Sequence, residues 1–187
     1  EAVAHGWEIH QVYYHDESVR SDKALQVLDE LDERVCIELT RPVLTRLSER
    51  PENPAELIAV VGTPGGDLGR VPLGGAMLAG LIEEPRDPGN LGTIIRTVDA
   101  LGVGGVVLVG ASVDRYAPKT VRATMGSLFA APVAHVADVA AAGRWIEAAR
   151  EAAGDVQVVA TVPTDVLPIH ACDFSKPSIV VVGNERK

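Results

Sequence analysis

Three phrases in the second half of the chain combine residue types that bind or orient polar and anionic ligands. The first runs from Glu84 to Arg96. Asn90 stands where the N-cap of a following helix is expected. Its purely structural role would be to accept hydrogen bonds from the next backbone N–H groups. Gly92 has no Cβ, which lets another backbone or a ligand approach closely. A lone helix arginine is usually a solvated surface residue, but the apolar neighbours of Arg96 favour a position at the rim of a site.

The second phrase, from Asp114 to Ser127, places two cations at the start of a predicted helix. Lys119 and Arg122 are three residues apart and can therefore lie on one helix face. Helix N-termini and the fork of an arginine side chain both suit anions, so phosphate binding is the functional interpretation. The alternative interpretation is an ordinary charged surface face. Gly126 and Ser127 are expected to break the helix.

The third phrase follows an apolar run, Ser178 to Val182, whose composition is typical of a buried strand. Gly183, Asn184 and Glu185 come directly after this run. Open α/β sheets bind ligands at the carboxyl ends of their strands, so this turn is a candidate binding loop. The alternative is an ordinary turn.

Two other kinds of site find little support. The stretch from Gly102 to Gly105 precedes a strand, whereas the glycine-rich loop of a dinucleotide-binding site follows one. The five histidines are scattered and the two cysteines lie far apart, so the sequence predicts neither a metal site nor a disulfide framework. Free cysteines fit a reducing compartment, and we expect the protein in the cytoplasm.

The elements that must position these phrases form two predicted units. Hydrophobic periodicity predicts that residues 1–64 form a small α/β unit, in which short strands alternate with helices. Five glycines and two prolines in residues 63–76 favour a linker over 65–76. Residues 77–187 contain apolar strands of the kind found in parallel sheets, separated by helices. Strands are expected at 7–14, 35–39, 57–61, 77–82, 105–109, 156–160 and 178–182, and helices at 21–31, 42–47, 90–101, 118–127 and 139–152.

Composition limits the function further. Hydrophobic residues make up 47% of the 187, enough for a packed core, and no run of about 18 apolar residues predicts a membrane span. The formal charge is −9, from 26 acidic and 17 basic residues. This charge argues against a protein that binds nucleic acid through its bulk charge. If RNA is the partner, positive potential must be focused on one part of the surface.

The order and spacing of the three phrases resemble the SpoU (TrmH) family of SPOUT RNA methyltransferases. The resemblance rests on Asn90, Gly92 and Arg96, on the phrase Pro118–Ser127, and on the Gly-Asn-Glu turn at 183–185, and it runs from about residue 81 to the end. Residues 1–64 are similar in pattern to the small RNA-binding domain, with a ribosomal-protein-like fold, that many members carry in front.

This resemblance implies an S-adenosylmethionine-dependent ribose 2′-O-methyltransferase for structured RNA, with ribosomal RNA as first choice and transfer RNA as second. It implies a homodimer and a parallel sheet whose C-terminal segment forms a trefoil knot, an exception to the rule against knots. The family's third motif, a Ser-Leu-Asn phrase, is expected after Lys187, so the knot segment is largely absent from this chain. Implied site residues are Asn90, Arg96 and Glu185 for catalysis, Thr161, Val162, Gly183 and Asn184 for the cofactor, and Lys119, Arg122 and Ser127 for RNA.

Two rival functions remain open from the sequence. The first is a non-enzymatic RNA-binding module of the same fold, which cofactor titration would separate from an enzyme. The second is a metabolic nucleotide-binding α/β enzyme unrelated to RNA, which the acidic charge favours slightly and an RNA pull-down would test.

Overall fold

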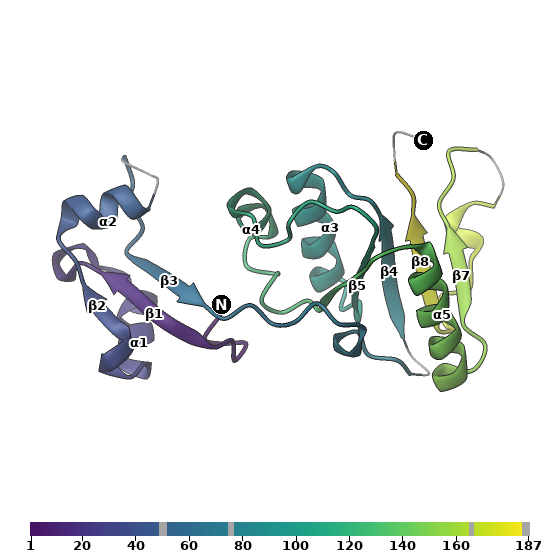
Figure 1. Ribbon diagram of the computed structural model, residues 1–187, viewed down its shortest axis with the longest axis horizontal. Helices are drawn as coiled ribbons and strands as arrows, with labels where there is room; N and C mark the ends of the chain where they lie inside the picture. The colour runs from purple at the N-terminus through teal and green to yellow at the C-terminus, as the bar shows by residue number, and fades with distance from the viewer. Residues whose placement is uncertain (49–51, 75–76, 165–166, 185–187) are drawn as a thin grey trace. The chain divides into compact units, whose positions relative to one another are not determined.

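The computed structural model describes residues 1–48, 52–74, 77–164 and 167–184. It divides the chain into two compact units, Glu1–Pro64 and Gly65–Lys187 (Figure 1). Each unit has its own sheet, which confirms the predicted α/β class. Within the described ranges, no helix is both long enough and apolar enough to cross a membrane.

The first unit is built on a three-stranded mixed sheet in the order β2-β1-β3. The central strand pairs in parallel with β2 and antiparallel with β3. Ser21 caps the first helix by accepting a hydrogen bond from the N–H of Ala24, and Pro42 lies in the first turn of the second. The elements are β1 (Ile9–Tyr14), α1 (Asp22–Glu30), β2 (Cys36–Glu38), α2 (Arg41–Leu47) and β3 (Leu57–Val61).

The second unit contains a five-stranded sheet in the order β6-β5-β4-β8-β7, and all of its strand pairs are parallel. Every residue of β5 is buried, as expected for a parallel strand that is covered on both faces. The strands are β4 (Leu78–Glu83), β5 (Gly105–Val109), β6 (Val133–Val136), β7 (Gln157–Ala160) and β8 (Ser178–Val182). The helices are α3 (Pro88–Ala100), α4 (Pro118–Thr124) and α5 (Val139–Ala153).

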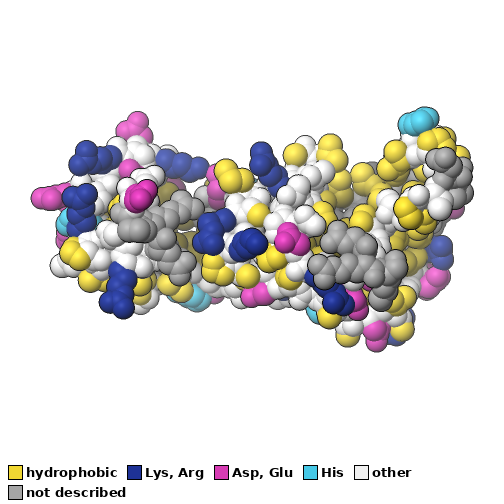
Figure 2. Space-filling model, turned by 90° about the horizontal axis from the view of Figure 1, so that it is seen from above, with side chains coloured by type: hydrophobic (Ala, Val, Ile, Leu, Met, Phe, Trp, Pro, Cys, Tyr) yellow, Lys and Arg dark blue, Asp and Glu magenta, His cyan; other side chains and the backbone are white. Residues whose placement is uncertain are grey.

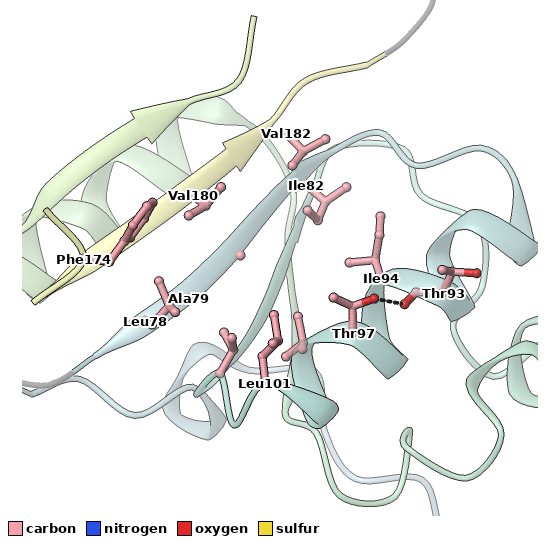
Figure 3. Close-up of a pocket in the computed structure, with 13 residues that line it drawn as sticks. Leu78, Ala79, Ile82, Thr93, Ile94, Thr97, Leu101, Phe174, Val180 and Val182 are labelled. Atoms are coloured by element: carbon pink, nitrogen blue, oxygen red, sulfur yellow. Dashed lines mark hydrogen bonds between the residues drawn. The ribbon is translucent and has the colours of Figure 1, made fainter. Parts of the chain in front are cut away.

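Alternate residues of the central strands point to opposite faces of this sheet. Leu81 and Ile179 belong to a core cluster that includes Trp145 of α5. Their strand neighbours Ile82 and Val180 lie on the other face, which α3 partly covers (Figure 3). The two helices therefore sandwich the sheet, and the strand ends are left at its edge.

Three local predictions differ from the structure. β6 is absent from the predicted elements, because His135 interrupts its short apolar run, Val133–Val136. The helix expected from residue 90 begins at Pro88, and its N-cap is Asp87, whose carboxylate accepts a hydrogen bond from the N–H of Asn90 at 2.8 Å. The capping role expected for Asn90 is therefore wrong, since Asp-Pro begins the helix three residues earlier. α4 ends at Thr124, before the predicted Ser127, because Met125 adopts a left-handed conformation.

Residues 65–76 were predicted as a linker, and the described part of this segment, 65–74, is partly structured. Leu68–Arg70 forms a 3₁₀ helix, which begins where the Asp67 carboxylate accepts a hydrogen bond from the N–H of Gly69. Val71 is only 2% exposed and belongs to the core of the second unit. The glycine content indicated an irregular backbone in this segment. The segment is nevertheless not a free linker, because apolar side chains between the glycines, Leu68 and Val71, pack onto the core of the second unit.

Gly92 is where α3 and α4 come into close contact. A Cβ added at Gly92 would overlap the Cβ of Ala123 and lie 3.0 Å from the carbonyl oxygen of Thr120. The expectation that this glycine permits close approach is confirmed, and the neighbour is a helix of the same unit. Because helix backbone cannot move aside cheaply, we expect Gly92→Ala to lower the free energy of unfolding by about 2 kcal/mol.

Gly143 provides a matched control, because it lies in α5 and a Cβ there would meet no atom within 4 Å. Gly143→Ala should raise the free energy of unfolding by about 0.5–1 kcal/mol, through helix propensity. Urea unfolding followed by Trp145 fluorescence, with Trp7 replaced by Phe, reports on the second unit. Equal midpoints for the two alanine variants would contradict this account of the α3–α4 contact.

Candidate active site at the carboxyl edge of the parallel sheet

The parallel sheet brings the three sequence phrases to one edge. In the strand register, Ile82 of β4 pairs with Leu108 of β5 on one side and with Val182 of β8 on the other. The residues that follow these strands therefore emerge side by side. Ligands of open α/β sheets bind at this carboxyl edge, outside the strand ends.

A pocket of about 140 Å³ lies at the ends of β4 and β8. It brings together Asn90 from the first turn of α3 and the two residues that follow β8, Gly183 and Asn184. Three of the predicted site residues, which are about 90 positions apart in the sequence, thus line one cavity. Glu185, the third predicted catalytic residue, lies outside the described residues.

Acidic side chains form one wall of this pocket. A carboxylate oxygen of Glu84 accepts a hydrogen bond from the Asn184 side-chain amide at 3.4 Å and pairs with the Arg86 guanidinium at 3.1 Å. A Cβ added at Gly183 would lie 3.9 Å from the Glu83 carboxylate. Three carboxylates line this pocket, those of Glu83, Glu84 and Asp87, against the one guanidinium of Arg86. They favour a ligand that is cationic or donates hydrogen bonds.

Thr161 and Val162 line a different pocket, of about 510 Å³, beyond the end of β7. The backbone N–H and the hydroxyl of Thr161 both donate to the carbonyl oxygen of Val181, at 2.9 and 3.1 Å, which ties this loop to β8. Leu167 and Ile169 give the pocket apolar walls. The four predicted cofactor residues are therefore divided between two pockets along the same sheet edge.

The predicted basic residues lie on α3 and α4. Arg96 is exposed and does not line the pocket of Asn90. It follows Gly92 by four residues, so it lies one turn along the side of α3 that faces α4. Lys119 and Arg122 are exposed on α4. Within the described part of the chain, no ion pair involves any of these three cations. Figure 2 shows basic side chains (dark blue) close together over the end of the second unit that carries α4.

A third cavity, an apolar groove of about 390 Å³, runs between α3 and the exposed face of β4 and β8 (Figure 3). Its only hydroxyls, on Thr93 and Thr97, donate to carbonyl oxygens of their own helix. A groove with no free polar group cannot orient a polar ligand. It adjoins the candidate pocket, with which it shares Ile82, Ile94 and Val182, but adds no polar group to it.

The comparison with known protein families decides the identity of this fold. The model of the SpoU rRNA Methylase family matches residues 78–187, which include every strand of the parallel sheet and the turn at Gly183. The chain belongs to the SpoU rRNA methylase family.

Relatives within this SpoU family are similar over most of the chain. The 23S rRNA (uridine(2479)-2′-O)-methyltransferase of Streptomyces viridochromogenes is 35% identical over 98% of this chain and 64% of its own length. The 23S rRNA (guanosine(2553)-2′-O)-methyltransferase RlmP of Bacillus subtilis is 31% identical over 80% of this chain and 56% of its own. This chain thus spans less than two thirds of these relatives.

A solved structure extends the likeness to the fold. The SpoU methyltransferase AviRb from Streptomyces viridochromogenes, in complex with the cofactor AdoMet, superposes with a TM-score of 0.86 at 34% identity. The superposition covers 99% of this chain and 69% of that one. Both units of this SpoU family member therefore share their architecture with AviRb.

Two residues of this SpoU family member stand out only in the structure. Glu84 contacts the Asn184 turn, and the signal for it in the sequence is its position immediately after an apolar strand. The Arg115 guanidinium stacks on the Tyr116 ring, with 4.7 Å from its central carbon to the ring centroid. The Nε atom of Arg115 is buried and has no hydrogen-bond partner among the described residues. Arg115 directly precedes Tyr116 in the sequence, but no sequence pattern indicated that the two side chains stack or that the guanidinium is partly buried.

Proposed function

We propose that the protein is an S-adenosylmethionine-dependent methyltransferase that acts on a ribose 2′-hydroxyl of structured RNA, with ribosomal RNA as the substrate. The observation that carries the proposal is that Asn90, Gly183 and Asn184 line one pocket at the carboxyl edge of a SpoU-family sheet. The names of the Streptomyces and Bacillus relatives both describe 2′-O-methylation of 23S rRNA, which supports the choice of RNA. We place this activity in the cytoplasm.

The described residues fit S-adenosylmethionine, which when bound supplies a methyl group on a positively charged sulfur. The Glu83 carboxylate beside Gly183 suits a cation, and the backbone at Gly183 has open space for a ligand to approach. The apolar walls of the pocket at Thr161 and Val162 suit the faces of an adenine ring. We therefore propose Thr161, Val162, Gly183 and Asn184 as the residues that hold the cofactor.

Arg96 is proposed to act as a cation, because a guanidinium stays protonated in proteins and is a poor base. It would bind the phosphate next to the target ribose and place positive charge where the 2′-alkoxide develops. The hydroxyl proton would pass to a phosphate oxygen or to water. Asn90 and Glu185 are proposed to orient the pocket loops. Because Arg96 lies toward α4, the RNA must span from α4 to the pocket.

The distribution of charge supports binding of RNA phosphates by the second unit. Residues 1–64 contain 13 acidic and 6 basic residues, whereas residues 65–187 contain 13 acidic and 11 basic residues. The excess of negative charge thus lies mainly in the first unit. We propose that Lys119, Arg122 and Ser127 bind the RNA backbone, and that residues 1–64 recognise the RNA by shape, without a strong bulk attraction.

The C-terminal trefoil knot and the homodimer are also proposals for the whole protein. The apolar groove between α3, β4 and β8 supports them, since it leaves Leu101 72% exposed and presents Val180 and Val182. Apolar surface of this kind is stabilised when it is covered. A knotted segment and a second subunit would together cover it.

The proposed function is tested by mapping 2′-O-methyl groups on ribosomal and transfer RNA from cells with and without the full-length protein. One ribosomal position that loses its methyl group is the expected result. Loss at a transfer RNA position would reassign the substrate. Unchanged maps with tight RNA binding would support a non-enzymatic module, and unchanged maps without RNA binding would support a metabolic enzyme.

A further inference from the structure

Glu84 is held in a backbone conformation that side chains rarely adopt. Its φ is +42°, and it shares a positive φ with only one other described non-glycine residue, Met125. In this region the Cβ of an L-residue crowds the neighbouring carbonyl oxygen, so stability alone would favour glycine. Strained positions of this kind persist only where surrounding contacts hold them in place, and they are concentrated at functional sites.

Contacts with β5 hold Glu84 in place. Its backbone N–H donates to the carbonyl oxygen of Val109 at 2.9 Å, at the end of β5. Its side chain crosses over Gly110, where an added Cβ would lie 3.2 Å from the Glu84 Cγ. Only 23% of the side chain is exposed. The carboxylate is therefore aimed across the sheet edge and does not extend into solvent.

The carboxylate contacts both sides of the candidate pocket. Asn184, which follows β8, donates its side-chain amide to one oxygen of Glu84. Arg86, which follows β4, pairs with the same oxygen. Glu84 thus connects the ends of three adjacent strands, β5, β4 and β8, and all three of Glu84, Arg86 and Asn184 line the pocket.

We propose that Glu84 is a positioning residue, whose carboxylate holds Asn184 and thereby preforms the Gly183–Asn184 segment for the cofactor. This inference rests on the proposed function of that segment. A loop already held in its binding conformation loses less conformational entropy when the ligand binds. The strained backbone at Glu84 thus lowers the stability of the fold, and the benefit is tighter binding of the cofactor.

Replacing Glu84 by glycine separates these two effects. Glu84→Gly removes the carboxylate and relaxes the backbone, so the full-length protein should unfold at the same or a higher urea concentration. Its affinity for S-adenosylmethionine, measured by isothermal titration calorimetry, should fall about tenfold, as expected for the loss of a hydrogen bond to a charged group. Glu84→Gln retains an acceptor for Asn184 and should lose only about threefold.

Met125→Gly is the matched control, because Met125 has a φ of +52° at the end of α4 and lines none of the pockets along the sheet edge. It should relax the backbone in the same way and leave the affinity for S-adenosylmethionine unchanged. An equal loss of affinity in Met125→Gly would overturn the inference, since relaxed backbone alone would then explain the effect.

Two further measurements test whether Glu84 affects cofactor affinity through Asn184. The double variant Glu84→Gly/Asn184→Ala should bind no more weakly than Asn184→Ala alone, and additive losses would overturn the inference. The demethylated product, S-adenosylhomocysteine, should lose affinity by the same factor as S-adenosylmethionine. A loss confined to the cationic sulfonium would mean that the Glu84 charge acts directly on the ligand.

The failure of this inference is distinguishable from failure of the proposed function. Wild-type protein that binds no S-adenosylmethionine would refute the proposed function, and the inference with it. Wild-type protein that binds the cofactor, with unchanged affinity in Glu84→Gly, would refute the inference alone.

Discussion

Arg96→Ala is expected to lower the rate of methyl transfer by about 10²–10³-fold, the effect typical of removing one charged or donor group that stabilises a developing oxyanion. The fold should be unaffected. Arg96 is exposed and has no ion-pair partner among the described residues, so the change in unfolding free energy should stay within about 0.5 kcal/mol. Transfer of a tritiated methyl group to RNA, together with urea unfolding of the same samples, measures both quantities.

Two controls sharpen this result. Arg96→Lys retains the charge but not the planar fork, so its rate should lie between those of wild type and Arg96→Ala. Arg150→Ala removes another exposed helix arginine, which pairs with Glu147 on α5, and should leave the rate unchanged. Wild-type activity in Arg96→Ala would refute the assignment of this residue. A loss of activity that tracks a loss of folded protein would also refute it.

Neutralising Lys119 and Arg122 together should also have a large effect, on the affinity for RNA and on its salt dependence. Each cation that contacts a phosphate releases counterions, so log affinity falls with log salt by about 0.7–0.9 per contact. The double variant Lys119→Gln/Arg122→Gln should therefore bind RNA more weakly, with a salt slope shallower by about 1.4–1.8. Filter binding between low and moderate salt gives the slope, and affinity for S-adenosylmethionine should not change.

The matched control removes the same total charge elsewhere. Arg144 and Arg150 are exposed on α5, which lies on the other face of the sheet from α3. Arg144→Gln/Arg150→Gln makes the protein equally more acidic but should leave the salt slope intact. If both double variants flatten the slope equally, then net charge governs binding and the local patch on α3 and α4 does not.

Local patterns in the sequence were sufficient to predict most of the elements. The periodicity of apolar residues depends only on neighbours within a few positions, so the long strands and helices, including all of β5 and α5, were predictable within a few residues. Prediction from short-range patterns failed where two signals competed. Asn90 is a residue type that often caps helices, but Asp87 is another, it comes earlier in the chain, and it is followed by Pro88, so the helix begins there. The apolar run of β6 is interrupted by His135, so the sequence did not indicate a strand there.

The family could be recognised without coordinates, since the spacing of Asn90, Gly92, Arg96 and Gly183 is a property of the chain alone. Tertiary structure decided which of these residues meet. The strand order β5-β4-β8 places Glu84 beside Asn184, a hundred residues away. The packing of α4 against Gly92 leaves Arg96 on the side of α3 toward α4, outside the pocket of Asn90. Strand order and helix direction arise from packing the whole sheet, so no local pattern contains them. The strain at Glu84 has the same origin, because only the neighbouring strand ends hold that backbone in place.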